Sequence, residues 1–112
     1  MEFLGELRVR AVMDSFHIVS SFLYGIAERL NLTEDTLFDL DLAIEEASVN
    51  IIQYAYPDRP PGEMLISASL EDEKLHFTLV DWGIPFDPNK IKPYDISYVE
   101  LIVEIGNTEL YN

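Results

Sequence analysis

Apolar residues recur every three or four positions in the first third of the chain, which is the period of an amphipathic helix. The residues with this spacing are Phe16, Val19, Leu23, Ile26 and Leu30. Asp14 or Ser15 precedes them and can cap a helix N-terminus, and Asn31 and Leu32 follow them. The pattern therefore predicts a helix from about residue 16 to residue 30.

Two apolar residues of this helix, Ile18 and Phe22, lie off the apolar stripe. A helix that is buried on two sides explains them, and so does a surface that binds a partner or a second copy of the chain. An edge strand at the N-terminus is another candidate place for a symmetric dimer.

A second and longer helix is predicted from about Glu34 to Ala55. Thr33 has the character of an N-cap, acidic residues occupy the first turn, and Pro57 with residues 59–62 ends the helix. One side of its helical wheel carries Leu37, Leu40, Ile44, Ala47, Ile51 and Ala55. The other side carries Asp39, Leu42, Ala43, Glu46, Asn50 and Gln53. The first side is expected to face the core, and the second is available for chemistry.

The remaining patterns have the period of strands. Residues 3–10 alternate loosely, as in a half-buried edge strand, and residues 63–70 and 74–80 alternate around a polar turn, as in a hairpin. Residues 91–95 are typical of a loop, residues 99–105 are apolar enough for a strand, and residues 108–111 suit a last short strand. This order predicts one α+β domain over residues 1–112, a two-layer sandwich whose mixed, largely antiparallel sheet carries helices on one face.

Composition limits the partners that we expect. The net charge of −14 makes nucleic acid an unfavourable ligand, because its phosphates would be repelled. The chain has no cysteine, which excludes disulfides and thiolate metal sites. It also shows neither a basic and apolar leader nor a run of 18 apolar residues, so we expect a soluble, cytoplasmic protein that does not bind a membrane.

Candidate chemistry lies in two segments. Glu46 and Asn50 are one helical turn apart, so a carboxylate and an amide oxygen share one face and can hold a hydrated magnesium ion. Asp81 ends the second hairpin strand, and Gly83 follows it. Considered separately, Glu46 is explained by a solvated helix acid and residues 81–83 by a turn. Together, and with the resemblance described next, they favour a nucleotide site. His17 and His76 are isolated, and we do not expect either to bind a metal.

Together, residues 45–57 and 80–88 resemble the ATP-binding signature of the anti-sigma factor serine/threonine kinases, small members of the histidine kinase-like ATPase superfamily (the Bergerat fold). The resemblance covers roughly residues 1 to 90. It implies that Glu46 and Asn50 occupy the family's glutamate and asparagine positions, that Tyr56 is the tyrosine closing the helix, and that Asp81 and Gly83 form the Asp-x-Gly that receives adenine.

The resemblance implies ATP and Mg²⁺ as ligands. Asn50, with Glu46, would hold magnesium between the phosphates, and Glu46 would accept or orient the proton of a serine or threonine hydroxyl. Asp81 would accept a hydrogen bond from the adenine amine, and Gly83 would let the backbone approach the base. The implied protein partners are a sigma factor and the antagonist protein that is phosphorylated.

One element of the family signature is missing. The glycine-rich box that opens a third helix and holds the triphosphate has no counterpart, and the only late glycine is Gly106. Either the domain has lost this lid, or a lid segment is absent from the sequence between about residues 90 and 99. The first explanation favours a non-catalytic protein-binding switch over a kinase, and an interaction domain without nucleotide is a third reading.

Overall fold

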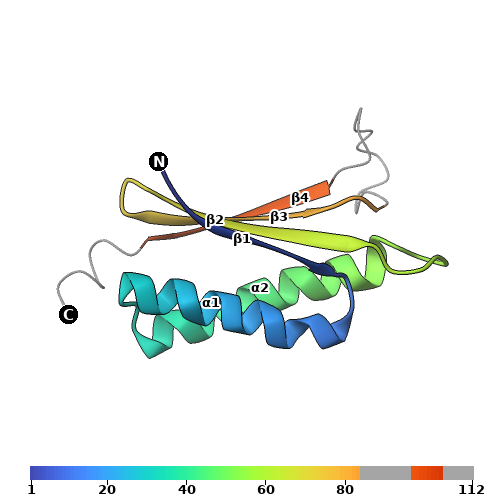
Figure 1. The fold of residues 1–112 in the computed structure, drawn as a ribbon, viewed down its shortest axis with the longest axis horizontal. Helices are drawn as coiled ribbons and strands as arrows, with labels where there is room; N and C mark the ends of the chain where they lie inside the picture. The colour runs from blue at the N-terminus through green and yellow to red at the C-terminus, as the bar shows by residue number, and fades with distance from the viewer. Residues whose placement is uncertain (84–96, 105–112) are drawn as a thin grey trace.

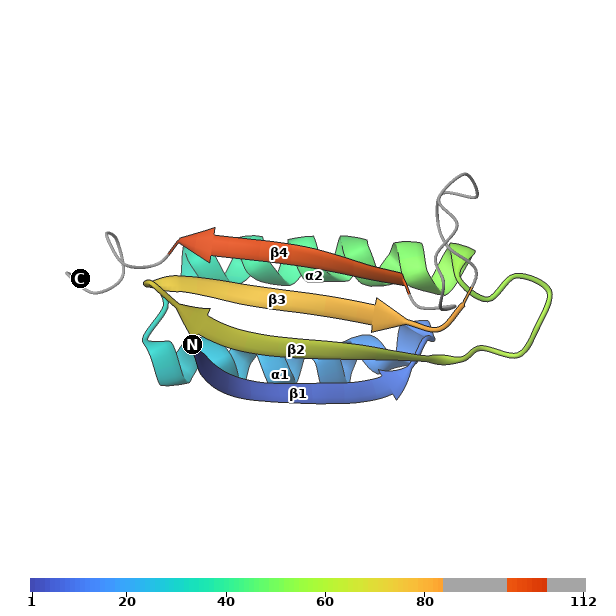
Figure 2. The same cartoon turned by 90° about the horizontal axis from the view of Figure 1, so that it is seen from above.

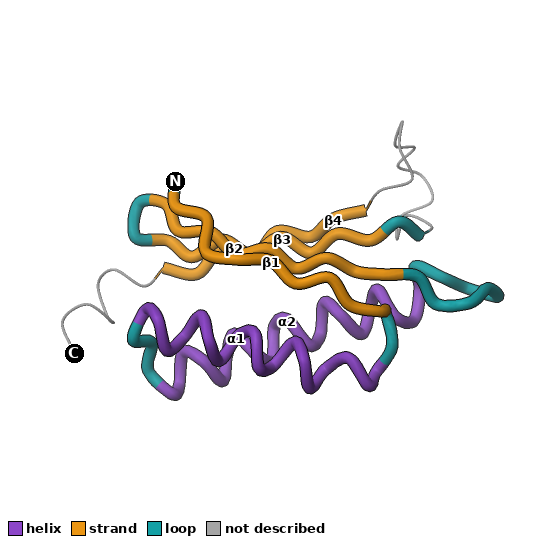
Figure 3. The backbone as a smooth tube through the Cα atoms, in the orientation of Figure 1, coloured by secondary structure: helices purple, strands orange, loops and turns teal. Residues whose placement is uncertain are grey.

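The computed structural model describes residues 1–83 and 97–104. In chain order the elements are β1 (Glu2–Arg10), a 3-10 turn (Met13–Ser15), α1 (Phe16–Leu30), α2 (Glu34–Tyr54), β2 (Glu63–Glu71), β3 (Lys74–Asp81) and β4 (Ser97–Glu104). Both helices lie on the same face of the sheet, which gives two layers (Figure 1, Figure 3). The predicted two-layer α+β architecture is confirmed.

The four strands follow one another across the sheet in the order β1-β2-β3-β4, and every neighbouring pair is antiparallel. Val9 pairs with Met64, and Phe77 pairs with both Ala68 and Leu101. The fourth strand agrees with the strand expected at residues 99–105. The expected lid break near residues 90–99 lies largely, and the last strand at 108–111 entirely, outside the described residues.

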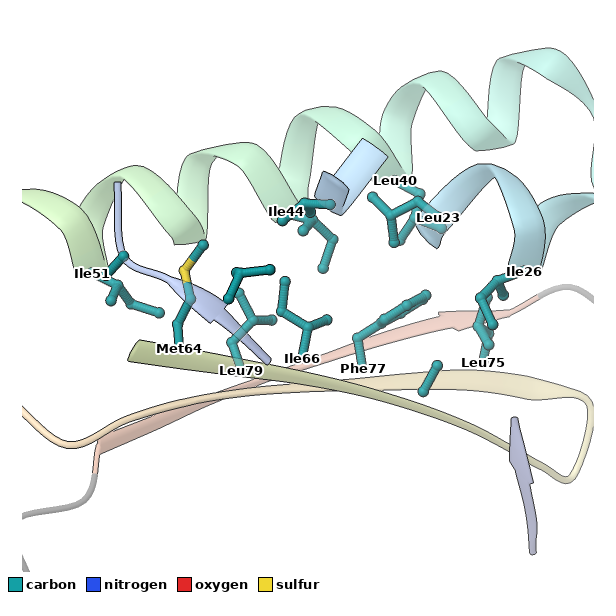
Figure 4. Packing of buried hydrophobic residues seen from close by; sticks show 14 of the residues in the cluster. Leu23, Ile26, Leu40, Ile44, Ile51, Met64, Ile66, Leu75, Phe77 and Leu79 are labelled. Carbon is teal, nitrogen blue, oxygen red and sulfur yellow. The ribbon is translucent and has the colours of Figure 1, made fainter. Parts of the chain in front are cut away.

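The core lies between the two layers. Seen from above, α1 lies under the half of the sheet formed by β1 and β2, and α2 lies under the half formed by β3 and β4 (Figure 2). Side chains from both helices meet side chains from the strands in Figure 4. The fully buried large residues are Phe77, Leu23, Ile44, Met64, Ile66, Leu75 and Leu79. Each such side chain contributes about 1.5–3 kcal/mol through the removal of apolar surface from water.

The helix boundaries agree with the sequence, and Ser15 is the N-cap residue of α1, but its side chain does not make the expected capping hydrogen bond. Thr33 caps α2 as expected, because its hydroxyl accepts the Thr36 backbone N–H at 3.1 Å. Neither Asp14 nor Ser15 caps α1 through its side chain. The chain enters α1 from the 3-10 turn with Ser15 already in helical backbone geometry, and the Ser15 hydroxyl instead donates to the Arg10 carbonyl at 2.6 Å.

The two residues off the α1 stripe have different environments. Phe22 is half-buried and packs against the core beside Gly5, so burial on a second side explains it. Ile18 is 52% exposed. Among the described residues, no helix is both long enough and apolar enough to cross a membrane.

Candidate functional site

Helix α2 carries the first two candidate residues on its solvent-exposed side. The helix is continuous over Glu34–Tyr54, so Glu46 and Asn50 are separated by about one turn, and both side chains are exposed. The two predicted faces are confirmed, because Leu40, Ile44 and Ile51 are buried on the opposite side. A carboxylate and an amide are therefore presented side by side to solvent.

Asp81 is the candidate residue with the most enclosed position. It is the last residue of β3 and only 5% exposed, and its carboxylate oxygen Oδ1 accepts the Gly83 backbone N–H at 3.0 Å. A buried carboxylate requires hydrogen-bond donors, since desolvation without them costs several kcal/mol. The turn after β3 supplies one of them and fixes the direction of the side chain.

Gly83 brings this turn against the end of α2. A Cβ atom built on Gly83 would lie 1.9 Å from the carbonyl oxygen of Ala55, the C-cap residue of α2. No side chain fits in that space, so glycine is required for the turn and the helix end to touch. The sequence predicts Gly83 as a point of close approach to a base, and the structure adds a packing reason for the same glycine.

The contact at Ala55 sets the layout of the candidate residues. The ends of α2 and β3 lie at the same end of the molecule (Figure 1). At a rise of 1.5 Å per residue, Asn50 lies about 7.5 Å and Glu46 about 13.5 Å from Ala55 along the helix axis. Asp81 and Gly83 therefore border the last turn of the helix that carries Asn50 and Glu46. Moving from that helix end back along the axis of α2, the candidate side chains follow in the order Asp81, Asn50, Glu46.

Tyr56 connects these parts, and reasoning from the sequence recognised it only as the tyrosine that closes the helix. Its hydroxyl donates to the Glu63 carbonyl at 2.7 Å and accepts the Trp82 backbone N–H at 3.0 Å. Burial, the largest influence, raises the pKa of the Tyr56 hydroxyl above 10, and the negative charge of Asp81 acts in the same direction. The phenol is therefore protonated at neutral pH, as its donor role requires.

Within the described residues of this site, the candidate metal ligands are oxygen donors. In the described part of the chain, no three His, Asp or Glu side chains gather in a group that could hold a metal ion. Glu46 and Asn50 supply two neighbouring oxygens, which suits a cation such as Mg²⁺ that keeps water ligands and shares its coordination with phosphates.

Residues 84–88 of the second motif lie outside the described residues. The role of Glu46, Asn50, Asp81 and Gly83 in binding a ligand therefore stays a prediction. The structure establishes their positions: two exposed residues on one side of α2, and a buried acid in a turn packed on the end of the same helix.

Comparison with known proteins adds independent evidence. Residues 9–100 match the model of the family described as "Histidine kinase-like ATPase domain". Proteins named "Serine-protein kinase RsbW" from Bacillus cereus and from Bacillus thuringiensis subsp. konkukian (strain 97-27) are each 35% identical over 106 residues. These matches cover 90% of this chain and 66% of each relative, so the chain spans slightly less than two thirds of their length.

Proposed function

This chain belongs to the histidine kinase-like ATPase domain family, and from that premise we propose that it binds ATP beside α2 and transfers the γ-phosphoryl group to a protein serine or threonine. The family match includes both segments that carry the candidate residues. The relatives named serine-protein kinases support the class of acceptor.

One observation carries the proposal. Asp81 is a buried carboxylate whose direction is fixed by the Gly83 amide and whose turn packs on the last residues of α2. A fixed, acceptor-only group of this kind suits the exocyclic amine of adenine, which is a donor. With the base at Asp81, the phosphates would extend along α2 towards Asn50 and Glu46.

The phosphates would meet the two oxygens on α2. Glu46 and Asn50 fit a magnesium ion by donor type, and Mg²⁺ bound there with ATP would neutralise charge on the phosphates. This neutralisation is important in a chain with a net charge of −14, which otherwise repels a triphosphate.

The transfer step assigns a second role to Glu46. The acceptor hydroxyl oxygen attacks the γ-phosphorus, the bond from that phosphorus to the β,γ-bridging oxygen breaks, and ADP leaves with the electron pair. Glu46 accepts the hydroxyl proton. An exposed glutamate on a continuous helix can approach a protein substrate that docks over the nucleotide.

The finer identity of the partners also belongs to this proposal. The acceptor would be an anti-sigma factor antagonist protein, and the same domain would sequester a sigma factor. Both interactions would take place in the cytoplasm, and a homodimer of the domain belongs to the same proposal. The lack of a glycine-rich box after Asp81 favours one alternative, a binding switch on the same fold that does not transfer phosphate.

Nucleotide binding is tested by equilibrium titration of the full chain with ATP and Mg²⁺. Asp81→Asn keeps an oxygen for the Gly83 amide but loses the charge, and we expect ATP affinity to fall about 10- to 100-fold. Asn50→Ala should weaken binding only when Mg²⁺ is present. Asp72→Asn, in the turn between β2 and β3, is the matched control and should bind as wild type does. An absence of ATP binding by the wild-type chain would refute the proposal.

Transfer is tested with labelled ATP and a candidate antagonist protein. Glu46→Ala should keep most of its ATP binding, because Asn50 and the phosphates would still supply oxygens to the magnesium ion, and it should lose transfer by about 10²- to 10⁴-fold, the contribution of a general base. Glu45→Ala removes the neighbouring exposed acid, which lies about 100° away around the helix, and should keep transfer. ATP binding without any transfer by wild type would favour the switch, and equal transfer by Glu46→Ala and wild type would remove Glu46 from the mechanism.

A further inference from the structure

A closed ring of contacts joins Trp82, Tyr56, Glu63 and Arg8. The Tyr56 hydroxyl accepts the Trp82 N–H at 3.0 Å and donates to the Glu63 carbonyl at 2.7 Å. Glu63 also pairs through Oε1 with Arg8 Nη1 at 3.2 Å, and the Arg8 guanidinium lies 4.9 Å from the centre of the Trp82 ring. The end of α2, the strands β1 and β2, and the turn after β3 are thereby joined.

Tight packing holds the Tyr56 ring in this position. A Cβ atom built on Gly62 would lie 2.3 Å from the Tyr56 ring. The loop that joins α2 to β2 therefore passes directly over the ring, and residue 62 has no room for a side chain while the ring keeps this position. With the ring confined in this way, the hydroxyl has little freedom to leave its two partners.

The hydroxyl acts on a particular part of the turn. Its bond to the Trp82 N–H fixes the peptide that follows Asp81, and the bond from the Gly83 N–H to Asp81 Oδ1 fixes the next amide. Two successive backbone amides are held, one by Tyr56 and one by Asp81 itself. The direction of the Asp81 carboxylate then depends on Tyr56, although Tyr56 does not belong to the Asp-x-Gly motif.

We propose that Tyr56 is a positioning residue for nucleotide recognition: its hydroxyl, backed by Arg8 across the sheet, holds the turn after β3 so that the Asp81 carboxylate is directed at the amine of adenine. The inference rests on the proposed ATP-binding function and deepens it, because it makes the preference for adenine over guanine depend on a residue outside the motif. Guanine carries a carbonyl in place of that amine and offers the carboxylate no donor there.

A positioning role differs measurably from a purely structural one. If Tyr56 only supported the fold, its loss would weaken all nucleotides equally. If it directs Asp81, its loss weakens ATP more than GTP. The informative quantity is therefore the ratio of the two affinities, because a uniform loss of folded protein cancels in that ratio.

The experiment compares the full chain with Tyr56→Phe, which keeps the ring and removes the hydroxyl. Tyr24→Phe is the matched control, since Tyr24 is an exposed residue of α1. Arg8→Leu, which removes the guanidinium on Trp82, is a second variant. For each protein, ATP and GTP are titrated with Mg²⁺, and amide hydrogen exchange is followed at Trp82 and, as a check of the fold, at the core residues Phe77 and Leu79.

We expect Tyr56→Phe to bind ATP about five- to tenfold more weakly, the effect of one net hydrogen bond, while GTP binding changes little. Exchange at the Trp82 amide should accelerate, and exchange at Phe77 and Leu79 should not. Arg8→Leu should lower the ratio of ATP to GTP affinity by a smaller factor than Tyr56→Phe does, and Tyr24→Phe should leave this ratio unchanged.

Three results would overturn the proposal. They are an unchanged ratio of ATP to GTP affinity in Tyr56→Phe, an unchanged rate of hydrogen exchange at the Trp82 amide in that variant, and equal binding of ATP and GTP by the wild-type chain. A wild-type chain that binds neither nucleotide refutes the proposed function instead, and the Trp82 amide then decides whether Tyr56 holds the turn at all. If Tyr56→Phe does not fold, the ratio of ATP to GTP affinity in Arg8→Leu becomes the test. If that ratio equals the wild-type ratio, the positioning role is refuted.

Discussion

Ser48 lies on the buried side of α2, and its side chain is fully enclosed. Its hydroxyl oxygen has no hydrogen-bond partner within the described part of the chain. A buried polar group without a partner costs about 1–3 kcal/mol. At Ser48, therefore, the native residue opposes folding.

We expect Ser48→Ala to raise the free energy of unfolding by about 1 kcal/mol, because it removes the unpaired hydroxyl and leaves almost no cavity. Urea denaturation measures the change. Ser20→Ala is the control, since the Ser20 hydroxyl is exposed and hydrogen-bonded to Asp41 at 3.1 Å, and it should show no gain. A less stable Ser48→Ala would mean that the hydroxyl has a favourable role.

The raised pKa of the Tyr56 hydroxyl implies that the stability of the chain depends on pH. Its pKa is raised in the folded chain, chiefly by burial, so the folded state holds this proton more tightly than the unfolded chain does. This difference in pKa adds to the free energy of unfolding. The added stability is fully present below the unfolded pKa of about 10, and it is lost as pH rises from there through the raised pKa of the folded chain.

Stability measured from pH 8 to above 10 should therefore decline more steeply for wild type than for Tyr56→Phe. Tyr24→Phe, at an exposed residue of α1, is the control for the removal of one hydroxyl group. Parallel curves for all three proteins would contradict a raised pKa at Tyr56.

At the scale of elements, the contact between β3 and α2 depends on Gly83. Gly83→Ala would force its Cβ against the Ala55 carbonyl, a backbone atom that cannot rotate away. We expect a loss of about 1–3 kcal/mol of stability and weaker ATP binding, because the turn that holds Asp81 must move. Thermal unfolding and ATP titration measure the two effects.

Gly25→Ala is the matched control for this substitution. Gly25 lies inside α1 and is exposed, and beyond its chain neighbours and the backbone of its own helix no atom lies within 4 Å of a built Cβ. Alanine in a helix is more favourable than glycine, so this variant should gain up to about 1 kcal/mol. If both variants behave alike, the close approach at Ala55 does not constrain the turn.

Local patterns in the sequence predicted the two α-helices and the four strands that the structure describes, but not the 3-10 turn. The two faces of α2, the Thr33 cap and the hairpin of β2 and β3 follow from periods of 3.6 and 2 and from residues at helix ends. The predicted capping of α1 failed because Ser15 bonds to Arg10 across the 3-10 turn, which periodicity does not reveal.

The candidate site was predictable only in part. Glu46 and Asn50 follow from helical spacing, and Asp81 with Gly83 follows from the end of a strand pattern. The contacts that join them, Tyr56 to Trp82 and Gly83 to Ala55, link residues more than 25 positions apart. Such contacts depend on tertiary packing, and the available local signals were only a tyrosine at a helix end and glycines at positions 62 and 83.

At the scale of the whole molecule, charge is the dominant feature. The chain has 21 acidic and 7 basic residues and a net charge of −14. Like charges oppose a compact state, and salt screens them by shortening the Debye length from about 30 Å at 0.01 M to about 8 Å at 0.15 M. Electrostatic repulsion is therefore expected to limit stability at low ionic strength.

We expect the Tm of the wild-type chain to rise by several degrees when NaCl is increased from about 0.01 M to about 0.15 M, a range in which screening changes most. Thermal unfolding followed by circular dichroism measures it. Sucrose at the same osmolality is the control for effects unrelated to charge, and an equal or larger rise in sucrose would contradict the electrostatic explanation.

The position of Trp82 has a practical consequence. It is the only tryptophan of the chain, 36% exposed, placed between Asp81 and Gly83 and covered on one side by Arg8. Its indole emission therefore reports on a single place, the turn where we expect the purine to bind. Occupancy of this domain can be followed by intrinsic fluorescence, in unlabelled protein and in real time.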